Sequence, residues 1–151
     1  MKLKELMGSG RKIGKMATPL LVIGLIINLI FPAIFSLGGP ENSIKNLSVF
    51  MFLVGLVVWI WGAALILIKV PQKQLITSGP FALVKHPLYT AIALLVLPWG
   101  GIMLNSWLGI VVGMLVYKGM KIYAPEEEIL MAKTFGKEWD EYQKRVLLPW
   151  V

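Results

Sequence analysis

Long apolar runs alternate with short polar segments along most of the chain, and these runs predict its architecture. Several of them approach or exceed the ~20 residues that a helix needs to cross a bilayer. The predicted spans are residues 18–37, 46–68, 87–103 and 107–123. Only a Leu-Asn-Ser turn separates the last two, which are short and should form a tightly packed hairpin. We therefore predict an all-α integral membrane protein with about four transmembrane helices.

Prolines and glycines indicate where these helices begin, end and approach one another. Pro19 and Pro87 suit the first turn of a helix. Pro32 should kink its helix or end it early. Gly109 and Gly113 have the small-residue spacing that lets helices approach closely in lipid. We interpret that pair as helix packing rather than chemistry.

The last part of the chain, residues 125–151, is polar and periodic. Its apolar residues recur at steps of three or four, which places them on one face of a helix: Met131, Phe135, Trp139, Tyr142 and Val146. Gly136 interrupts this face, so two short helices meeting there fit as well as one long helix. Either arrangement predicts an amphipathic C-terminal segment on the cytoplasmic face of the membrane.

Composition and charge agree with a membrane protein. The chain is 57% hydrophobic and only 15% charged, with a mean hydropathy of +0.74. Its net charge of +7 would suggest nucleic acid in a soluble protein, but membrane proteins concentrate Lys and Arg in cytoplasmic loops. With four spans and both termini cytoplasmic, fourteen of the fifteen basic residues lie inside and only Lys45 lies outside. We expect a prokaryotic plasma membrane and no nucleic-acid partner.

The residue inventory excludes several chemistries. Without cysteine the chain has no disulfide, no thiolate nucleophile and no cysteine-type zinc site. A single histidine, His86, excludes a multi-histidine metal site within one chain, and we expect no metal. The remaining polar chemistry is concentrated in two segments predicted on the cytoplasmic face. These are the loop that ends at His86 and residues 123–136, which contain three consecutive glutamates.

His86 and Tyr89 are three residues apart in the helix that Pro87 opens, so they should lie on the same side of it. Simpler interpretations remain open. A lone interfacial histidine is often a polar cap at a helix entrance, and an interfacial tyrosine is often a membrane anchor. If a carboxylate lies beside them, the three groups could hold a charged, partly aromatic ligand.

Glu127 is the carboxylate best placed to join them. It precedes Met131 by four residues and therefore begins the apolar stripe, which predicts that it is buried. A buried acid needs a partner, and Lys85, Lys121 or a cationic ligand could supply one. Acids where a helix begins also complement its dipole, so the glutamate run has a purely structural interpretation as well.

Two segments resemble the isoprenylcysteine carboxyl methyltransferase-like membrane enzymes. LITSGPFALVKHPLYTA resembles their Leu-Val-Thr-x-Gly-x-Tyr-x-x-x-Arg-His-Pro-x-Tyr pattern. PEEEILMAKTFGKEWDEYQKRVLLPW is similar to their Glu-Glu-x-x-Leu…Phe-Gly-x-x-Tyr-x-x-Tyr-x-x-Arg-Val signature. The resemblance covers residues 75–149, with both signatures in the family's order around a helical hairpin. It implies S-adenosylmethionine as methyl donor and an acceptor that reaches the site from the membrane.

The resemblance also implies which residues hold the cofactor, although it identifies no catalytic residue. By position these are His86, Tyr89, Glu127 and Glu128. Lys85 replaces the arginine before His-Pro. Tyr123 stands where members that act on prenylated carboxylates have an arginine, which weakens the case for a carboxylate substrate. The nearest basic residues along the chain are Lys118, Lys121 and Arg145.

We therefore predict a membrane methyltransferase that moves a methyl group from S-adenosylmethionine to a lipophilic or amphiphilic carboxylate, amine or thiol. One alternative is a nicotinamide-dependent reductase of steroid-reductase-like fold, which would need more basic residues at the cofactor. A small carrier is another, although the first three spans contain no ionisable residue. We expect a single membrane domain, with two N-terminal spans in residues 1–68 and the cofactor-binding core in residues 69–151. Its expected partners are the bilayer and the acceptor.

Overall fold

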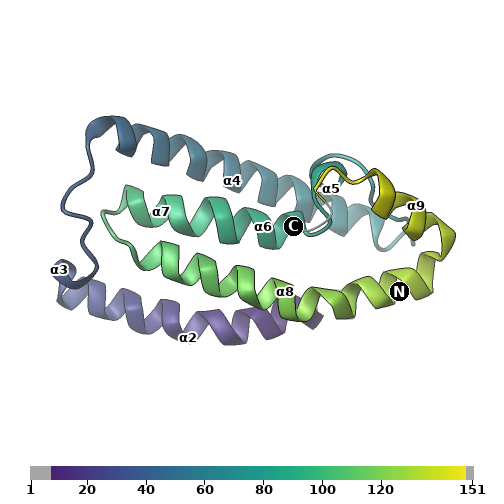
Figure 1. Cartoon of the computed structure of the whole chain (residues 1–151), viewed down its shortest axis with the longest axis horizontal. Helices are drawn as coiled ribbons and strands as arrows, with labels where there is room; N and C mark the ends of the chain where they lie inside the picture. Colours follow the sequence, from purple (N-terminus) through teal and green to yellow (C-terminus); the bar gives the residue numbers. More distant parts are fainter. Residues whose placement is uncertain (1–7, 149–151) are drawn as a thin grey trace.

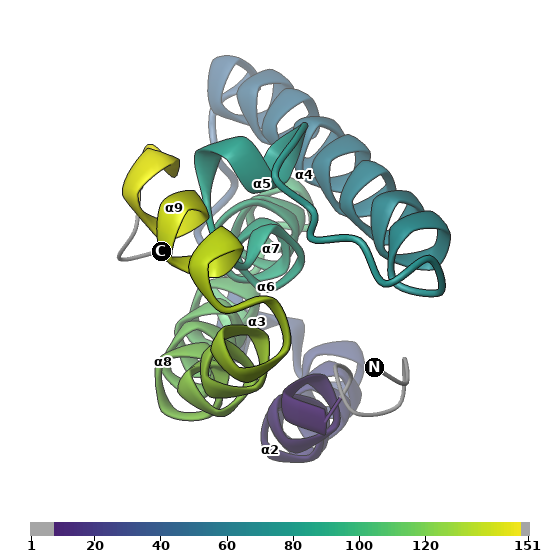
Figure 2. The same cartoon turned by 90° about the vertical axis from the view of Figure 1, so that its right-hand side faces the viewer.

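The computed structural model describes residues 8–148 and is built from helices. These are α2 (Gly8–Ile30), α3 (Pro32–Phe35), α4 (Asn42–Lys69), α5 (Pro80–Leu83), α6 (Pro87–Thr90), the π-helical η1 (Ala91–Val96), α7 (Leu97–Met103), α8 (Leu108–Phe135) and α9 (Lys137–Arg145). α2, α7 and α8 run roughly along one axis, and α4 crosses them obliquely (Figures 1 and 2). The predictions for residues 1–7 of the basic N-terminal segment and for the last residues of the second signature lie outside the described residues.

Three of the helices in this part of the chain, α2, α4 and α8, are long and apolar enough to cross a membrane. Much of the surface of α2 and α4 consists of exposed aliphatic and aromatic side chains, such as Leu29 and Phe50, which lipid can cover. The predicted third span, Pro87–Met103, forms a shorter apolar helix with the predicted bounds. The all-α membrane fold is confirmed, whereas the count of four spans stays a prediction.

The predicted first span begins at residue 18, whereas α2 begins at Gly8. Pro19 lies inside α2, not in its first turn. A proline inside a helix removes one backbone hydrogen bond. The turns before it persist because Ile13 and Ala17 are buried in the core against α8. The other end agrees with the prediction, since α2 ends at Ile30 and Pro32 opens α3.

The fourth span was predicted to end near Tyr123, but the helix that contains it does not end there. α8 continues through Pro125 to Phe135. Contacts with α2 hold these additional turns, because Ser9 Oγ donates to the Tyr123 carbonyl at 2.9 Å. The helix ends at Gly136, whose φ of +53° favours glycine. The chain then turns into α9, so of the two arrangements considered, the break at Gly136 is the one observed.

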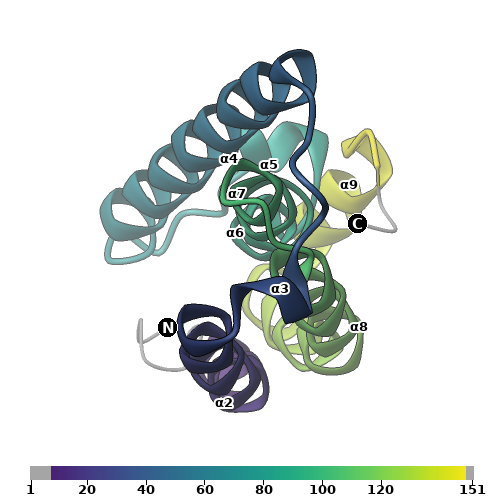
Figure 3. The same cartoon turned by 90° about the vertical axis from the view of Figure 1, so that its left-hand side faces the viewer.

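α8 is the central helix of the bundle. It packs against α2 on one side and against η1 and α7 on the other, and α4 packs against η1 and α7 (Figures 2 and 3). The α7–α8 approach requires glycine. A Cβ on Gly113 would lie 2.5 Å from the Ala93 carbonyl oxygen, and one on Gly109 would overlap the Leu97 carbonyl. The Gly-x-x-x-Gly pair therefore serves helix packing.

The two ends of the bundle are built from different elements. At one end, α3 and the loop after it contact the 104–107 turn, where the Trp107 amide donates to the Phe35 carbonyl at 2.9 Å. At the other end, α5 and α9 gather beside the start of α6 (Figure 1). Ser9 of α2 reaches α8 there as well. The second end holds the residues that the sequence predicts as functional.

Candidate active site

His86 and Tyr89 lie where the third helix begins. His86 precedes Pro87, which opens α6, and Thr90 Oγ1 donates to the His86 carbonyl at 3.0 Å. The two rings are stacked with an interplanar angle of 27° and centroids 6.1 Å apart. The prediction that these side chains lie on the same side of the helix is confirmed.

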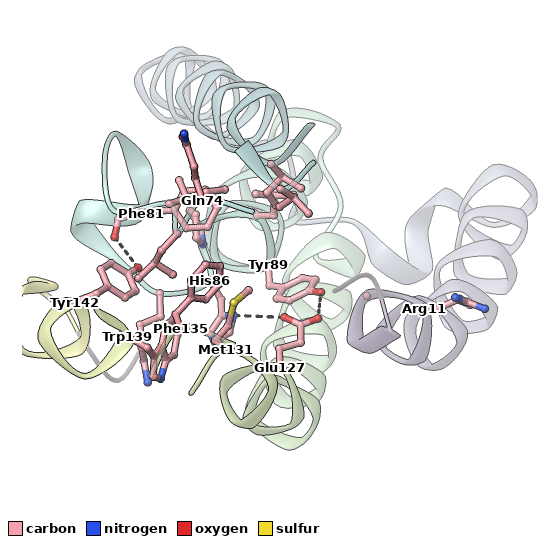
Figure 4. Close-up of a pocket in the computed structure, with 18 residues that line it drawn as sticks. Arg11, Gln74, Phe81, His86, Tyr89, Glu127, Met131, Phe135, Trp139 and Tyr142 are labelled. Carbon is pink, nitrogen blue, oxygen red and sulfur yellow. Dashed lines mark hydrogen bonds and ion pairs between the residues drawn. The ribbon is translucent and has the colours of Figure 1, made fainter. Parts of the chain in front are cut away.

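Glu127 is buried, as its place in the apolar stripe predicts, with 7% of its surface exposed. Tyr89 Oη donates to Glu127 Oε1 at 2.9 Å, and His86 Nδ1 lies 3.7 Å from Oε2 (Figure 4). Of the partners considered from the sequence, Lys85 is wrong, because it pairs with Glu128 instead. A neutral hydroxyl and an imidazole surround this carboxylate instead of a lysine.

Glu128 has different partners. Its Oε1 lies 2.6 Å from Lys85 Nζ and 3.1 Å from His86 Nε2. The side chain of Lys85 is 15% exposed and that of Glu128 is 25% exposed, so water screens this ion pair only in part. A protein cation thus compensates the charge of Glu128. His86 connects the two carboxylates, since one ring nitrogen faces each of them.

A cavity of about 470 Å³ opens beside these residues (Figure 4). His86, Tyr89 and Glu127 line it, whereas Glu128 does not. Most of the remaining lining is apolar. The aromatic members of that lining are Phe81, Phe135, Trp139 and Tyr142. The cavity therefore combines one buried carboxylate with flat apolar surfaces, which suits a ligand that carries both a positive charge and an aromatic ring.

α9 supplies part of the aromatic wall. Trp139 and Tyr142 are buried and pack with Met131 and Phe135 of α8, which confirms the predicted stripe. Tyr142 Oη donates to the Phe81 carbonyl at 2.8 Å and so ties α9 to α5. Burial raises the pKa of Tyr142, and the charge of Glu128 adds to this effect. The hydroxyl consequently stays protonated and keeps donating.

Residues 44–138 match a family model described as phospholipid methyltransferase. The match covers more than half of the chain and includes all four predicted site residues. The chain belongs to the phospholipid methyltransferase family. This membership confirms the resemblance to isoprenylcysteine carboxyl methyltransferase-like enzymes and, with the apolar helices, supports a membrane methyltransferase. No curated protein and no solved structure matches the chain.

α2 precedes the region that matches the phospholipid methyltransferase family, yet it contributes to the cavity. Gly10 and Arg11 are among the lining residues, although the Arg11 guanidinium points away from Glu127 (Figure 4). Neither residue was predicted, because the basic N-terminal segment was interpreted only as a topology signal. The sequence offered only a weak indication of this contact. Residues 8–10 are Gly-Ser-Gly, and such small side chains allow another element to approach the helix closely.

Tyr123, where the resemblance leads us to expect an arginine if the substrate were a carboxylate, has a cation from α2 as its neighbour. Lys12 Nζ lies 5.4 Å from the centroid of its ring and 2.7 Å from Glu126 Oε1. Lys12 is distant from Tyr123 in sequence and was not among the basic residues considered. Its charge is already paired with Glu126, so it does not substitute for an arginine that is open to an anionic ligand.

Proposed function

We propose that the protein transfers a methyl group from S-adenosylmethionine to an amine-bearing amphiphile at the membrane surface. One observation carries the proposal. Glu127 is a buried carboxylate at the edge of an otherwise apolar and aromatic cavity, and its nearest partners are Tyr89 and His86 rather than a lysine. Such a carboxylate favours a ligand that supplies the missing positive charge.

The lining residues fit this cofactor. Glu127 would bind a positively charged group through charge-assisted hydrogen bonds or direct attraction. The wall formed by Phe81, Phe135, Trp139 and Tyr142 would pack against the adenine ring. When bound, S-adenosylmethionine would supply a methyl group to the neutral nitrogen of the acceptor, with cleavage of the methyl–sulfur bond, and the acceptor ammonium would first lose its proton to water. The protein's contribution is to fix the ligand's orientation and exclude water, which is the main requirement of a direct displacement.

The two adjacent glutamates have different roles in this proposal. Glu127 lines the cavity and contacts the ligand. Glu128 lies behind it and orients His86 and Lys85. Two carboxylates and one imidazole thus hold the cavity edge in a single arrangement. We assign ligand contact to Glu127, Tyr89 and His86, and a positioning role to Glu128.

The charges around the cavity favour an amine over a carboxylate as acceptor. Among the residues that line it, Lys85 is paired with Glu128, and the Arg11 guanidinium points away from Glu127 (Figure 4). A carboxylate acceptor would face the like charge of Glu127, and neither of these cations lies beside that carboxylate. An amine carries no negative charge and agrees with the phospholipid description of the family. The bilayer would supply such an amphiphile to the cavity.

We also propose that this end of the molecule faces the cytoplasm of a prokaryotic cell. Fourteen of the fifteen basic residues fall on that side if the chain crosses the membrane four times. The segment 69–151 would form most of the cofactor-binding core. Three lining residues lie outside it: Gly10, Arg11 and Ile66.

Calorimetric binding of S-adenosylmethionine and its demethylated product to the detergent-purified full chain tests the cofactor assignment. Glu127→Gln should weaken binding of S-adenosylmethionine by about thirtyfold, because a charged contact contributes about 2 kcal/mol. The matched control is Glu126→Gln, which changes the preceding glutamate, whose side chain is 57% exposed and lies outside the cavity lining. It should bind as the wild type does. Absence of binding by the wild type would refute the cofactor assignment.

A second assay tests the acceptor. The full chain is incubated with S-adenosylmethionine that carries a labelled methyl group and with vesicles containing phosphatidylethanolamine, a prenylated cysteine carboxylate or a lipophilic thiol. We expect label on the amine lipid only. Transfer confined to the carboxylate or the thiol would overturn the acceptor assignment and leave the cofactor assignment intact.

A further inference from the structure

The first described turn of α2 closes the cavity against the Tyr89–Glu127 pair. Gly10 lines the cavity and lies directly against the Tyr89 hydroxyl, which itself donates to Glu127. Ser9 is 2% exposed, and its hydroxyl donates to the Tyr123 carbonyl, about one turn before Glu127. The same turn thus lies against Tyr89 and against the backbone of α8 beside Glu127.

Gly10 leaves no room for a side chain on this face of α2. A Cβ built there would lie 3.1 Å from Tyr89 Oη and 3.6 Å from Tyr89 Cε1. A contact of 3.1 Å is tighter than nine in ten real Cβ contacts, so the hydroxyl would have to move by a few tenths of an ångström. On its other side, the hydroxyl is hydrogen-bonded to Glu127 at 2.9 Å. Any displacement of Tyr89 would therefore reach the carboxylate.

We infer that Gly10 is a positioning residue of the active site, where the absence of a side chain lets the Tyr89 hydroxyl hold the Glu127 carboxylate at the cavity edge. This inference rests on the proposed function, because it concerns how Glu127 meets a cationic ligand. It adds to the site a helix that precedes the matched family region of residues 44–138. The active site is thus completed by a segment outside the two signatures.

Gly14 provides a matched control one turn along the same helix. A Cβ built on Gly14 has nothing within 4 Å. Gly10→Ala and Gly14→Ala therefore add the same methyl group to α2, and only the first meets Tyr89. Gly10→Ala should bind S-adenosylmethionine about tenfold more weakly, since small misplacements of a binding group are costly. Gly14→Ala should bind it as the wild type does and, as a better helix former, should not be less stable.

A double-mutant cycle separates positioning through Tyr89 from a general effect on α2. Tyr89→Phe removes the oxygen that the added Cβ would meet and leaves the ordinary contact with Cε1. In the Tyr89→Phe background, Gly10→Ala should have no further effect on binding, so the coupling equals the whole effect of Gly10→Ala. An equal loss in both backgrounds would show that Gly10 acts on the helix alone and would overturn the inference.

The thermal unfolding midpoint of each protein in the same cycle is also measured, without ligand. This keeps the test decisive if Tyr89→Phe binds too weakly for calorimetry. Gly10→Ala should lower the midpoint only when Tyr89 is present. If the wild type binds S-adenosylmethionine and Gly10→Ala binds it equally well, the inference fails while the proposed function stands. If the wild type binds neither S-adenosylmethionine nor its demethylated product, the proposed function fails, and the ligand role assigned to Gly10 fails with it.

Discussion

Glu127 and Glu128 are neighbours in α8 but have different partners, because successive residues of a helix project about 100° apart. Glu128 faces Lys85 and the Nε2 atom of His86. Glu127 faces the cavity and Tyr89. His86 lies between them with 11% of its side chain exposed. One pair of acids thus supplies both a fixed ion pair and a carboxylate that remains available to a ligand.

The Lys85–Glu128 pair should contribute measurably to stability. Glu128→Gln leaves the largely buried ammonium of Lys85 without its carboxylate and should destabilise the protein by about 1–2 kcal/mol. Lys85→Met combined with Glu128→Gln should recover part of that loss, because no lone charge remains. Thermal unfolding in detergent measures both variants.

The exposed Glu141–Arg145 pair of α9 is the control for that experiment. Its side chains are 66% and 79% exposed, and exposed ion pairs contribute little. Glu141→Gln should leave the unfolding midpoint almost unchanged. A loss as large as that of Glu128→Gln would show that the burial of the Lys85 pair has no energetic consequence.

At the level of residues, the sequence predicts side chains that local periodicity brings together, and it misses those that packing brings together. The spacing of His86 and Tyr89 and the burial of Glu127 follow from helix geometry alone. The approach of Ser9 and Gly10 does not, because it depends on which face of α2 packs against α8. Nothing near residues 8–10 specifies partners such as Tyr89 and Tyr123, which lie far away along the chain.

The close approach of α7 and α8 depends on glycines, because a larger residue at these positions would collide with backbone atoms that cannot move aside. Gly109→Ala would place its Cβ against the Leu97 carbonyl, a backbone group that cannot rotate away. It should destabilise the protein by about 3 kcal/mol or more, at the upper end of overpacking effects. The loss of stability is measured by unfolding the protein in detergent while the helical circular dichroism signal is monitored.

Gly100→Ala is the comparison for Gly109→Ala, because its added Cβ would meet a side chain. The nearest atoms are two ring carbons of Phe52 at 3.2 Å, and the ring can move by a few tenths of an ångström. We expect a loss of about 1 kcal/mol. Equal losses for the two variants would indicate that the α7–α8 contact can relax and is not set by the glycine.

At the level of elements, helix bounds were predictable where a proline or a glycine marks them within the helix's own sequence. Pro87 opens the third helix as predicted, and that helix ends at Met103, the predicted end of the span. The fourth span was predicted to end near Tyr123, yet α8 continues through Pro125. An internal proline costs a helix about 3 kcal/mol, and contacts that involve Ser9 and Lys12 of α2 offset this cost. Those contacts were beyond local prediction.

The whole molecule is polarised along its long axis. α5 and α9, which contribute residues to the cavity lining, lie at one end, and α3 with the loop before α4 lies at the other (Figure 1). Ser9, from the first described turn, and Leu148, the last described residue, both contact elements at the cavity end. This arrangement agrees with an even number of membrane crossings, even though the third helix is short.

The absence of cysteine makes the orientation directly testable. Glu41→Cys and Lys137→Cys each introduce a single thiol at an exposed position, one at each end of the bundle. Because the basic residues gather at the cavity end, the positive-inside rule places Lys137 in the cytoplasm and Glu41 outside. A membrane-impermeant maleimide should label Glu41→Cys in intact cells and Lys137→Cys only after permeabilisation. The opposite pattern would invert the topology and place the cavity away from cytoplasmic S-adenosylmethionine, which would contradict the proposed function as well as the orientation.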